Sequence, residues 1–187
     1  MHKFDPEKAE KLINPERYHE LKPDILLQRL AVPPGSTLLD LGCGNGFFTF
    51  PASAAMGENG MVIAADTSSE MLLALNRRVP GDNVQVLEVE EVKLDIEDES
   101  VDGVVTITVF HEFKKPSENL VEIYRVLKPG GKLMIIDWKP DTENMSGPSQ
   151  SDRVFVDDAH KIVEEAGFSI IVAEPHSETK WIIIAGK

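Results

Sequence analysis

Three glycines and two acidic residues have the types and the spacing that can bind a nucleotide. The glycines are Gly42, Gly44 and Gly46. They follow an apolar run that includes Asp40, and a second apolar run, residues 61–65, is followed by Asp66. Glycines in a turn after a strand let a ligand approach the main chain, and the helix that follows offers free N–H groups. A carboxylate at the end of the second strand can bind both hydroxyls of a ribose. We therefore expect a nucleotide-like ligand over residues 42–46.

The spacing of the glycines bears on which nucleotide the turn binds. A dinucleotide-binding turn usually reads G-x-G-x-x-G. Here the pattern is G-x-G-x-G, and Phe47 stands where the third fingerprint glycine would lie. Asp66 does not separate the two possibilities, because both kinds of cofactor carry a ribose. The turn thus argues against a nicotinamide-dependent oxidoreductase, which remains the less favoured alternative.

Four segments at this order and spacing carry a family resemblance. They are residues 40–46 (DLGCGNG), 66–72 (DTSSEML), 83–102 and 127–133 (LKPGGKL). Together they resemble the class I S-adenosylmethionine-dependent methyltransferases, especially the small-molecule enzymes related to ubiquinone and menaquinone biosynthesis. The resemblance implies S-adenosylmethionine as the cofactor, S-adenosylhomocysteine as its product and a small-molecule methyl acceptor.

The resemblance assigns contacts with the cofactor to the ends of successive strands. Asp40 would orient the ammonium group, directly or through water, and Asp66 would bind the ribose. Glu90 stands where the family usually has an aspartate for the adenine amino group, and the next residue would supply a backbone N–H; solvated acids are the alternative for both. The full expected set is Asp40, Gly42, Cys43, Gly44, Gly46, Asp66, Thr67, Met71, Glu90, Glu91, Thr106 and Thr108.

The acceptor is expected beside the ends of the fourth and fifth strands. His111 follows the fourth strand and can take a proton from the acceptor, because an unperturbed imidazole titrates near neutral pH. Packing of the loop is the alternative role for this histidine. Trp138 ends the fifth strand and is expected to wall the substrate pocket, with ordinary core packing as the alternative. Tyr18 lies in helices that either cover the cofactor or cap the sheet.

Composition disfavours several other kinds of function. One cysteine, Cys43, cannot build a disulfide framework, and it argues against an arsenic methyltransferase, whose chemistry relies on several cysteines. The formal net charge of −13 disfavours nucleic acid as a substrate. No apolar run reaches the length of a membrane span, and no signal segment is visible, so we expect a cytoplasmic protein. The other histidines show no ligand spacing, which predicts no metal; they are His2, His19, His160 and His176.

Alternating strand and helix patterns must position these residues. Strands are expected at 37–41, 61–65, 84–89, 102–109 and 132–137, and helices between them at 45–56, 68–78 and 117–127. A helix over 154–166 precedes strands 168–174 and 179–185, whose short connection makes them antiparallel neighbours. The sequence therefore predicts an α/β fold: a Rossmann-like, doubly wound, seven-stranded, mostly parallel sheet with one antiparallel strand near the C-terminus.

The length of 187 residues suits one domain over 1–187. We expect an N-terminal helical cap over 1–35, with helices at 5–13, 15–21 and 23–31. A cofactor-binding core over 36–140 and a loop, helix and hairpin over 141–187 complete the domain. The predicted function is methyl transfer from S-adenosylmethionine to a small molecule, mainly by proximity and orientation. A non-catalytic regulatory or partner protein that binds this cofactor is the alternative.

Overall fold

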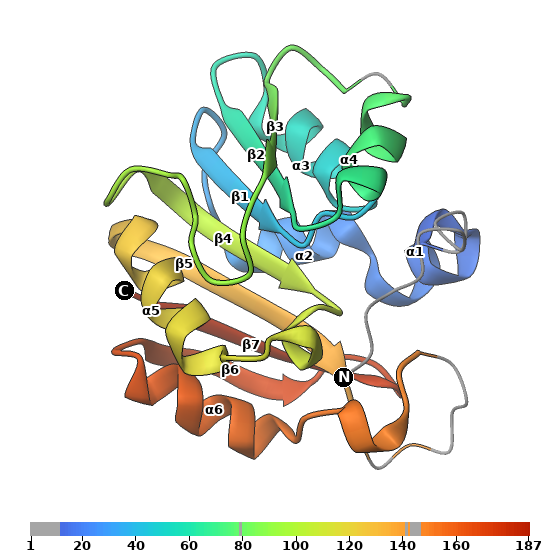
Figure 1. Ribbon diagram of the computed structural model, residues 1–187, viewed down its shortest axis with the longest axis vertical. Coiled ribbons are helices and arrows are strands. Elements are labelled where there is room, and N and C mark those ends of the chain that lie inside the picture. The colour runs from blue at the N-terminus through green and yellow to red at the C-terminus, as the bar shows by residue number, and fades with distance from the viewer. Residues whose placement is uncertain (1–11, 79, 141, 143–146) are drawn as a thin grey trace.

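The structure is a computed structural model, and it describes residues 12–78, 80–140, 142 and 147–187. Within these residues one sheet forms the middle layer (Figure 1). Its strands are β1 (Thr37–Leu41), β2 (Met61–Asp66), β3 (Val84–Glu88), β4 (Val101–Ile107), β5 (Leu127–Trp138), β6 (Ser169–Pro175) and β7 (Lys180–Gly186). Their order across the sheet is β3-β2-β1-β4-β5-β7-β6.

Strand direction confirms the predicted topology. The pairs β1–β2, β2–β3, β1–β4 and β4–β5 are parallel. The pairs β5–β7 and β7–β6 are antiparallel, so β7 is the reversed strand. The seven-stranded, mostly parallel, Rossmann-like sheet that the sequence predicts is therefore the observed one.

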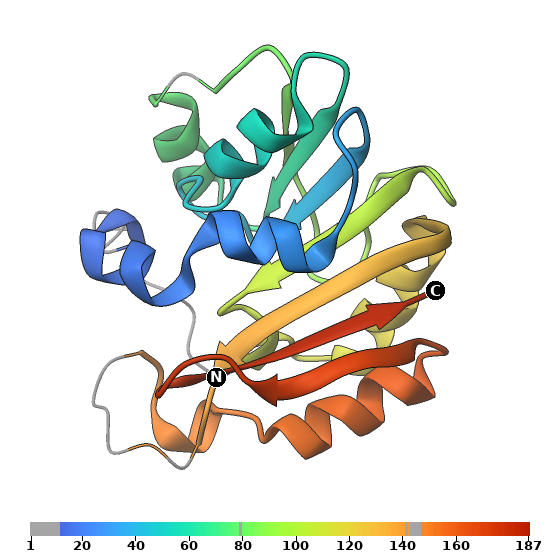
Figure 2. The ribbon, with the colours of Figure 1, turned by 180° about the vertical axis from the view of Figure 1, so that it is seen from behind.

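Helices cover both faces of the sheet, as a buried parallel sheet requires. They are α1 (Pro15–Leu21), α2 (Pro23–Leu30), α3 (Thr49–Met56), α4 (Ser69–Asn76), α5 (Pro116–Val126) and α6 (Val156–Glu165), with short 3-10 turns η2 (Phe110–Glu112) and η3 (Gln150–Asp152). Helices α5 and α6 lie over one face (Figure 1), and α2 and α3 lie over the other (Figure 2). Strand residues alternate between the two cores: Leu39 packs with the α5–α6 side and Leu38 with the α2–α3 side.

Two elements begin four or five residues away from the predicted start, and the other described helices and strands begin within two residues of it. Helix α3 begins at Thr49 instead of residue 45, because Gly44 and Gly46 adopt positive φ angles that no helix contains. Strand β5 begins at Leu127 instead of residue 132, because Leu127 already pairs with Val101 of β4. The helix expected at 5–13 falls mostly outside the described residues. No described helix is long and apolar enough to cross a membrane.

The parallel strands β1 to β5 all end at one edge of the sheet. The chain leaves β1 toward one face and β4 toward the other, because β2 and β5 lie on opposite sides of this central pair. Such a switch in strand order opens a crevice at the carboxyl ends of the strands. The glycine turn, Asp66, Thr108 and Trp138 all follow or end strands at this edge.

A buried ion pair ties the N-terminal helices to the far side of the sheet. Lys180 begins β7, its side chain is 2% exposed, and its Nζ lies 2.6 Å from Oε2 of Glu20 in α1. Oε1 of the same carboxylate accepts hydrogen bonds from the hydroxyls of Ser177 and Thr179. These contacts hold α1 against the β6–β7 hairpin, beside the crevice.

We expect the Glu20→Ala variant to be less stable than the wild type, because it leaves the ammonium group of Lys180 buried without its carboxylate. The free energy of unfolding, measured with urea, should fall by about 3 kcal/mol, the lower end of the range for a broken buried pair. Glu20 is 29% exposed, which limits the loss. The double variant Glu20→Ala/Lys180→Met should recover part of it, and an equal loss in both variants would contradict the ion pair's role.

Candidate active site

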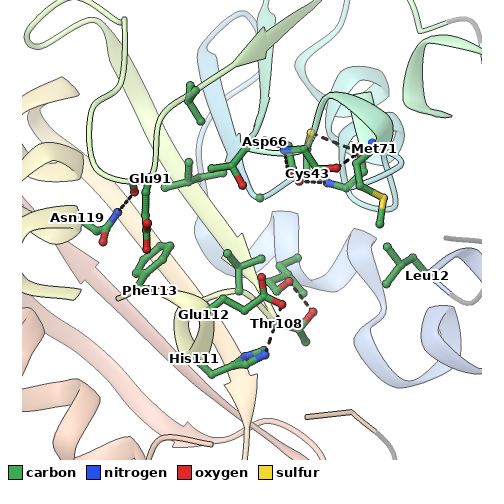
Figure 3. Close-up of a pocket in the computed structure, with 18 of the residues that line it drawn as sticks. Leu12, Cys43, Asp66, Met71, Glu91, Thr108, His111, Glu112, Phe113 and Asn119 are labelled. Carbon is green, nitrogen blue, oxygen red and sulfur yellow. Dashed lines mark hydrogen bonds and ion pairs between the residues drawn. The ribbon is translucent and has the colours of Figure 1, made fainter. Parts of the chain in front are cut away.

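A cavity of about 660 Å³ lies at the carboxyl edge of the sheet (Figure 3). This volume is within the range of about 300 to 1,000 Å³ that is usual for small-molecule sites. Its wall contains many of the residues that the sequence singled out. These are Gly42, Cys43, Gly44, Asp66, Thr67, Met71, Glu90, Glu91, Thr108, His111 and Trp138.

Four other expected residues do not line this cavity: Asp40, Gly46, Thr106 and Tyr18. Asp40 is 2% exposed, and its Oδ2 accepts a hydrogen bond of 2.6 Å from the hydroxyl of Thr49, the first residue of α3. Burial raises the pKa of Asp40 to about 7, although the Thr49 bond lowers it. Asp40 therefore joins β1 to α3 behind the turn, and its contact with the cofactor ammonium group, directly or through water, stays a prediction.

The other three residues, Gly46, Thr106 and Tyr18, pack against parts of the fold outside the cavity wall. A side chain at Gly46 would place its Cβ 2.6 Å from the ring of Phe50, so packing requires a glycine there. Thr106 is fully buried in β4, and its hydroxyl has no partner within the described part of the chain. Tyr18 rests edge-on against Phe47, with ring centres 4.8 Å apart. Tyr18 thus supports the residue after the glycine turn and does not reach the cavity itself.

The glycine turn is held open by contacts from neighbouring strands. A Cβ at Gly42 would lie 2.5 Å from Val109, so the close approach of these two segments depends on glycine. Gly44 has a φ of +54° and donates its N–H to Oδ2 of Asp66 at 2.8 Å. Oδ1 of Asp66 accepts the N–H of Ser68 at 2.9 Å, at the start of α4. Asp66 therefore fixes the turn while it remains in the cavity wall.

Glu90 and Glu91, the acids that follow β3, line the wall of the cavity opposite the glycine turn. The carboxylate of Glu91 is paired with Lys114, whose Nζ lies 2.7 Å from Oε2. The backbone oxygen of Glu91 accepts a hydrogen bond from the side-chain amide of Asn119 in α5 (Figure 3). Asn119 and Phe113 also line the cavity. Sequence reasoning missed both, because neither lies in a recognisable motif and α5 is distant in the chain.

A buried histidine and aspartate meet at the far end of the cavity. Nδ1 of His111, in η2, lies 2.8 Å from Oδ1 of Asp137 in β5. The same carboxylate accepts the backbone N–H groups of His111 at 2.9 Å and Trp138 at 2.7 Å. The ring thus bonds to a fully buried carboxylate and is fixed in one orientation. Nε2 of His111 lies 3.8 Å from Oε1 of Glu112.

Charges around His111 raise its pKa. Burial by itself lowers the pKa of the imidazole, but the hydrogen bond and charge of Asp137 outweigh it, and Glu112 and Asp152 act in the same direction. Because Asp137 holds Nδ1, Nε2 is the nitrogen left to exchange a proton. The sequence signal for this partner was the acid that closes β5, whose strand runs beside β4.

Two cations and a glycine hold Trp138 in the cavity wall. Nζ of Lys180 lies 3.8 Å from the centre of the Trp138 ring, and Cζ of Arg153 lies 5.4 Å from it. A Cβ at Gly147 would be 2.6 Å from Cε2 of the indole. The ring is therefore fixed by contacts on its surface, and it lines the same end of the cavity as His111.

Arg17 of α1 also lines the cavity and was missed from the sequence. Its Nη2 donates a 3.0 Å hydrogen bond to the hydroxyl of Thr108, and its guanidinium lies 4.6 Å from the centre of the Phe47 ring. No motif marked this residue, because only the fold brings α1 to the end of β4.

The donor set fits a nucleoside cofactor that carries positive charge. Glycine main chain and the Asp66 carboxylate lie on one side, and Glu90 and Glu91 lie on another, as ribose and adenine contacts would need. Carboxylates in the wall also suit ammonium and sulfonium groups. Among the described residues, no group of three or more His, Cys, Asp or Glu side chains is placed to hold a metal ion.

Comparisons with known proteins agree with this geometry. Residues 39–135 match a family described as a methyltransferase domain. A solved S-adenosylmethionine-dependent methyltransferase from Aquifex aeolicus is 34% identical, with a TM-score of 0.93, over 98% of this chain and 99% of that one.

Two curated relatives are longer than the matched region. An arsenite methyltransferase of Halobacterium salinarum is 34% identical over 80% of this chain and 41% of that protein. A demethylmenaquinone methyltransferase of Clavibacter sepedonicus is 37% identical over 58% of this chain and 44% of that protein. The chain thus spans less than half the length of either relative.

The matched domain covers more than half of the chain, and the Aquifex aeolicus enzyme aligns along nearly all of it. The TM-score of 0.93 shows that the Aquifex aeolicus enzyme shares the mostly parallel sheet of this chain. The chain therefore belongs to the class I S-adenosylmethionine-dependent methyltransferases, a family of enzymes whose cofactor is S-adenosylmethionine.

Proposed function

We propose that this chain transfers a methyl group from S-adenosylmethionine to a small organic acceptor that loses a proton to His111. The observation that carries the proposal is the His111–Asp137 pair, with Nδ1 and Oδ1 2.8 Å apart, in the wall of the cavity that also contains the glycine turn. A fixed base and a cofactor turn in one cavity are the two parts that such a reaction requires.

The glycine turn and the strand-end acids would hold the cofactor. Bound S-adenosylmethionine supplies an electrophilic methyl group on a sulfonium centre. Gly44 leaves room for close approach of the ligand to the main chain, since the nearest atom to a Cβ there would be Leu12 Cδ1 at 3.2 Å. Asp66 would accept hydrogen bonds from the ribose, and Glu90 with the main chain of Glu91 would contact the adenine.

His111 would act on the acceptor through Nε2. As the acceptor atom gains the methyl group, its proton passes to Nε2, and the imidazolium that forms is stabilised by Asp137 at Nδ1. Glu112, 3.8 Å from Nε2, places a further negative charge beside this proton. Trp138 closes the same end of the cavity and excludes water from it. Alignment of two reactants in this way can lower a barrier by about 7 to 11 kcal/mol.

The surroundings of Cys43 favour an organic acceptor over arsenite, which the name of one relative mentions. Cys43 is the single cysteine of the chain, and it is buried. Burial raises its pKa far above the ordinary value, and the charges of Asp40 and Asp66 raise it further, so the thiol stays protonated. A neutral thiol is a poor ligand for arsenic.

Binding and turnover measurements test the proposed function in two steps. By calorimetry, S-adenosylmethionine and S-adenosylhomocysteine should bind with micromolar dissociation constants, about −8 kcal/mol, and NAD should not bind. Mass spectrometry of a panel of small phenols, amines, thiols and quinols should then reveal a product heavier by one methylene group. Binding of NAD alone would overturn the proposal, and cofactor binding without any methylated product would favour the non-catalytic alternative.

The Asp66→Ala variant should bind S-adenosylhomocysteine more weakly by about 1 to 3 kcal/mol, because the ribose loses a charged acceptor and Gly44 loses its anchor. Calorimetric titration gives the dissociation constant. Asp82→Ala, an exposed carboxylate outside the cavity wall, is the control and should bind as the wild type does. Unchanged affinity in a folded Asp66→Ala protein would remove the ribose assignment.

The His111→Ala variant should turn over about 10²- to 10⁴-fold more slowly, the usual contribution of a positioned general base. Its affinity for S-adenosylhomocysteine should stay close to that of the wild type. His160→Ala removes a partly exposed histidine of α6 that pairs with Glu164, and it should keep full turnover. A loss that appears only in KM would show that His111 positions the acceptor and does not take its proton.

The pH dependence of kcat/KM should depend on the charge of Asp137, because this charge raises the pKa of His111. His111 acts as a base only when neutral, so kcat/KM should fall as the pH drops through its pKa, which Asp137 raises above the ordinary value of a histidine. Asp137→Asn removes the charge that raises this pKa, and the midpoint should move to lower pH. Circular dichroism must first show that the variant is folded, because Asp137 also accepts two backbone N–H groups. A midpoint that stays in place would separate Asp137 from the titration of His111.

A further inference from the structure

The guanidinium of Arg17 is a charged group in the cavity wall, and no described residue gives it a carboxylate partner within ion-pair distance. Its Nη2 donates to the hydroxyl of Thr108 at 3.0 Å, and its plane lies near the ring of Phe47. Its Nε is buried and has no hydrogen-bond partner within the residues that the structure describes. No ion pair of Arg17 occurs in that part of the chain either.

The two nearest acids are bonded elsewhere. The Asp40 carboxylate accepts the hydroxyl of Thr49 at 2.6 Å, and the Glu20 carboxylate is paired with Lys180 at 2.6 Å. Burial lowers the pKa of Arg17 to about 10, although the charges of Asp40 and Glu20 raise it. Arg17 stays protonated at neutral pH, and its desolvation is only partly offset by the protein.

Two other arginines of the chain, unlike Arg17, have carboxylate partners. Arg29 pairs with Glu174 at 2.6 Å, and Arg125 pairs with Glu122 at 2.7 Å. Both of these lie outside the cavity wall, whereas Arg17 lies in it. A half-buried guanidinium that lines a cavity, with no counter-ion among the described residues, is suited to receive an anion from a ligand, because its fork of N–H donors matches a carboxylate.

We propose that Arg17 is the anion-binding position of this cavity and takes a carboxylate group of a ligand. The group belongs either to the methionine end of the cofactor or to the methyl acceptor, and the inference rests on the proposed function. Arg17 joins Phe47, directly after the glycine turn, to Thr108 at the end of β4. It therefore stands between the expected cofactor turn and the expected acceptor end.

The charges elsewhere in the wall direct an anion to this position. The acidic residues of the lining are Asp66, Glu70, Glu90, Glu91 and Glu112. These carboxylates would repel a negatively charged group over most of the cavity. Arg17 is the arginine of the described wall, so the part of a ligand that carries negative charge is held where the guanidinium lies.

Two ligands that differ only in the carboxylate test whether the carboxylate that Arg17 binds belongs to the cofactor. Wild-type protein should bind S-adenosylmethionine about 10- to 100-fold more tightly than decarboxylated S-adenosylmethionine, the range for hydrogen bonds to a charged group. In Arg17→Met this ratio should fall to near one, and Arg17→Lys, which keeps a charge without the fork, should give an intermediate ratio. Calorimetry measures all dissociation constants without any need for an acceptor.

A matched substitution controls for the loss of the contact between Arg17 and the Phe47 ring in Arg17→Met. Arg78 also lies over an aromatic ring, with Cζ 4.2 Å from the centre of Phe50, and it donates to the backbone oxygen of Asn45 beside the same turn. It does not line the cavity. Arg78→Met should leave the ratio between the two ligands unchanged, even where it weakens both equally through the turn.

A second titration tests whether the carboxylate that Arg17 binds belongs to the methyl acceptor. Protein saturated with S-adenosylhomocysteine is titrated with acetate, and the ¹⁵N resonance of the arginine Nε–H groups is followed by NMR, with Arg17→Met used for assignment. If the cofactor carboxylate lies elsewhere, acetate should shift the Arg17 signal and leave Arg78 in place.

The outcomes separate this inference from the proposed function. A ratio that collapses in Arg17→Met identifies the cofactor carboxylate, and an acetate shift with an unchanged ratio identifies the acceptor. An unchanged ratio without an acetate shift overturns the inference and leaves the proposed function in place. If Arg17→Met fails to fold, Arg17→Lys replaces it in both experiments: it assigns the Arg17 resonance, and its ratio should lie below that of the wild type if the cofactor carboxylate binds there. Failure of wild-type protein to bind S-adenosylmethionine would instead contradict the proposed function.

Discussion

The arrangement of the active site depends on one constraint: five parallel strands must end at the same edge of the sheet. Strand order reverses between β1 and β4, so the loops that follow them turn to opposite faces and leave a cavity between them. The glycine turn after β1, Asp66 after β2 and His111 after β4 all face this cavity. The antiparallel pair β5–β7 completes the wall, because Lys180 is the register partner of Trp138.

Two charged groups near this edge, Asp137 and Lys180, are buried, and each has its own partners. Asp137 is compensated by two backbone N–H groups and by His111, and Lys180 is compensated by Glu20. Burying such groups costs free energy that only good hydrogen bonding offsets. Arg17 differs, because a hydroxyl and an aromatic face do not offset a full charge. This imbalance is the basis of the proposal that Arg17 binds an anionic group of a ligand.

The two ends of the cavity follow different physical rules. The cofactor end is built from main chain and strand-end acids, whose positions follow from the backbone pattern of strand, turn and helix. The proposed acceptor end is built from side chains of distant elements: His111 of η2 and Trp138 of β5 line it, and Arg17 of α1 lies in the same cavity wall. This division explains why members of one family can keep the cofactor and change the acceptor, since loops and caps vary while the turn stays in place.

From the sequence alone we predicted the sheet, its reversed strand and the family, and most of the expected cofactor residues lie in the wall of one cavity. Those features depend on local periodicity and on residues adjacent to strand ends, which a linear pattern displays. The sequence does not show that the Asp40 carboxylate accepts a hydrogen bond from Thr49, because that contact depends on how α3 packs behind the turn. Tertiary structure alone brought His111 to Asp137, 26 residues away in the chain, and Arg17 to Thr108, 91 residues away. Contacts over such separations are set by how helices pack across the sheet edge, and no short stretch of sequence records that packing.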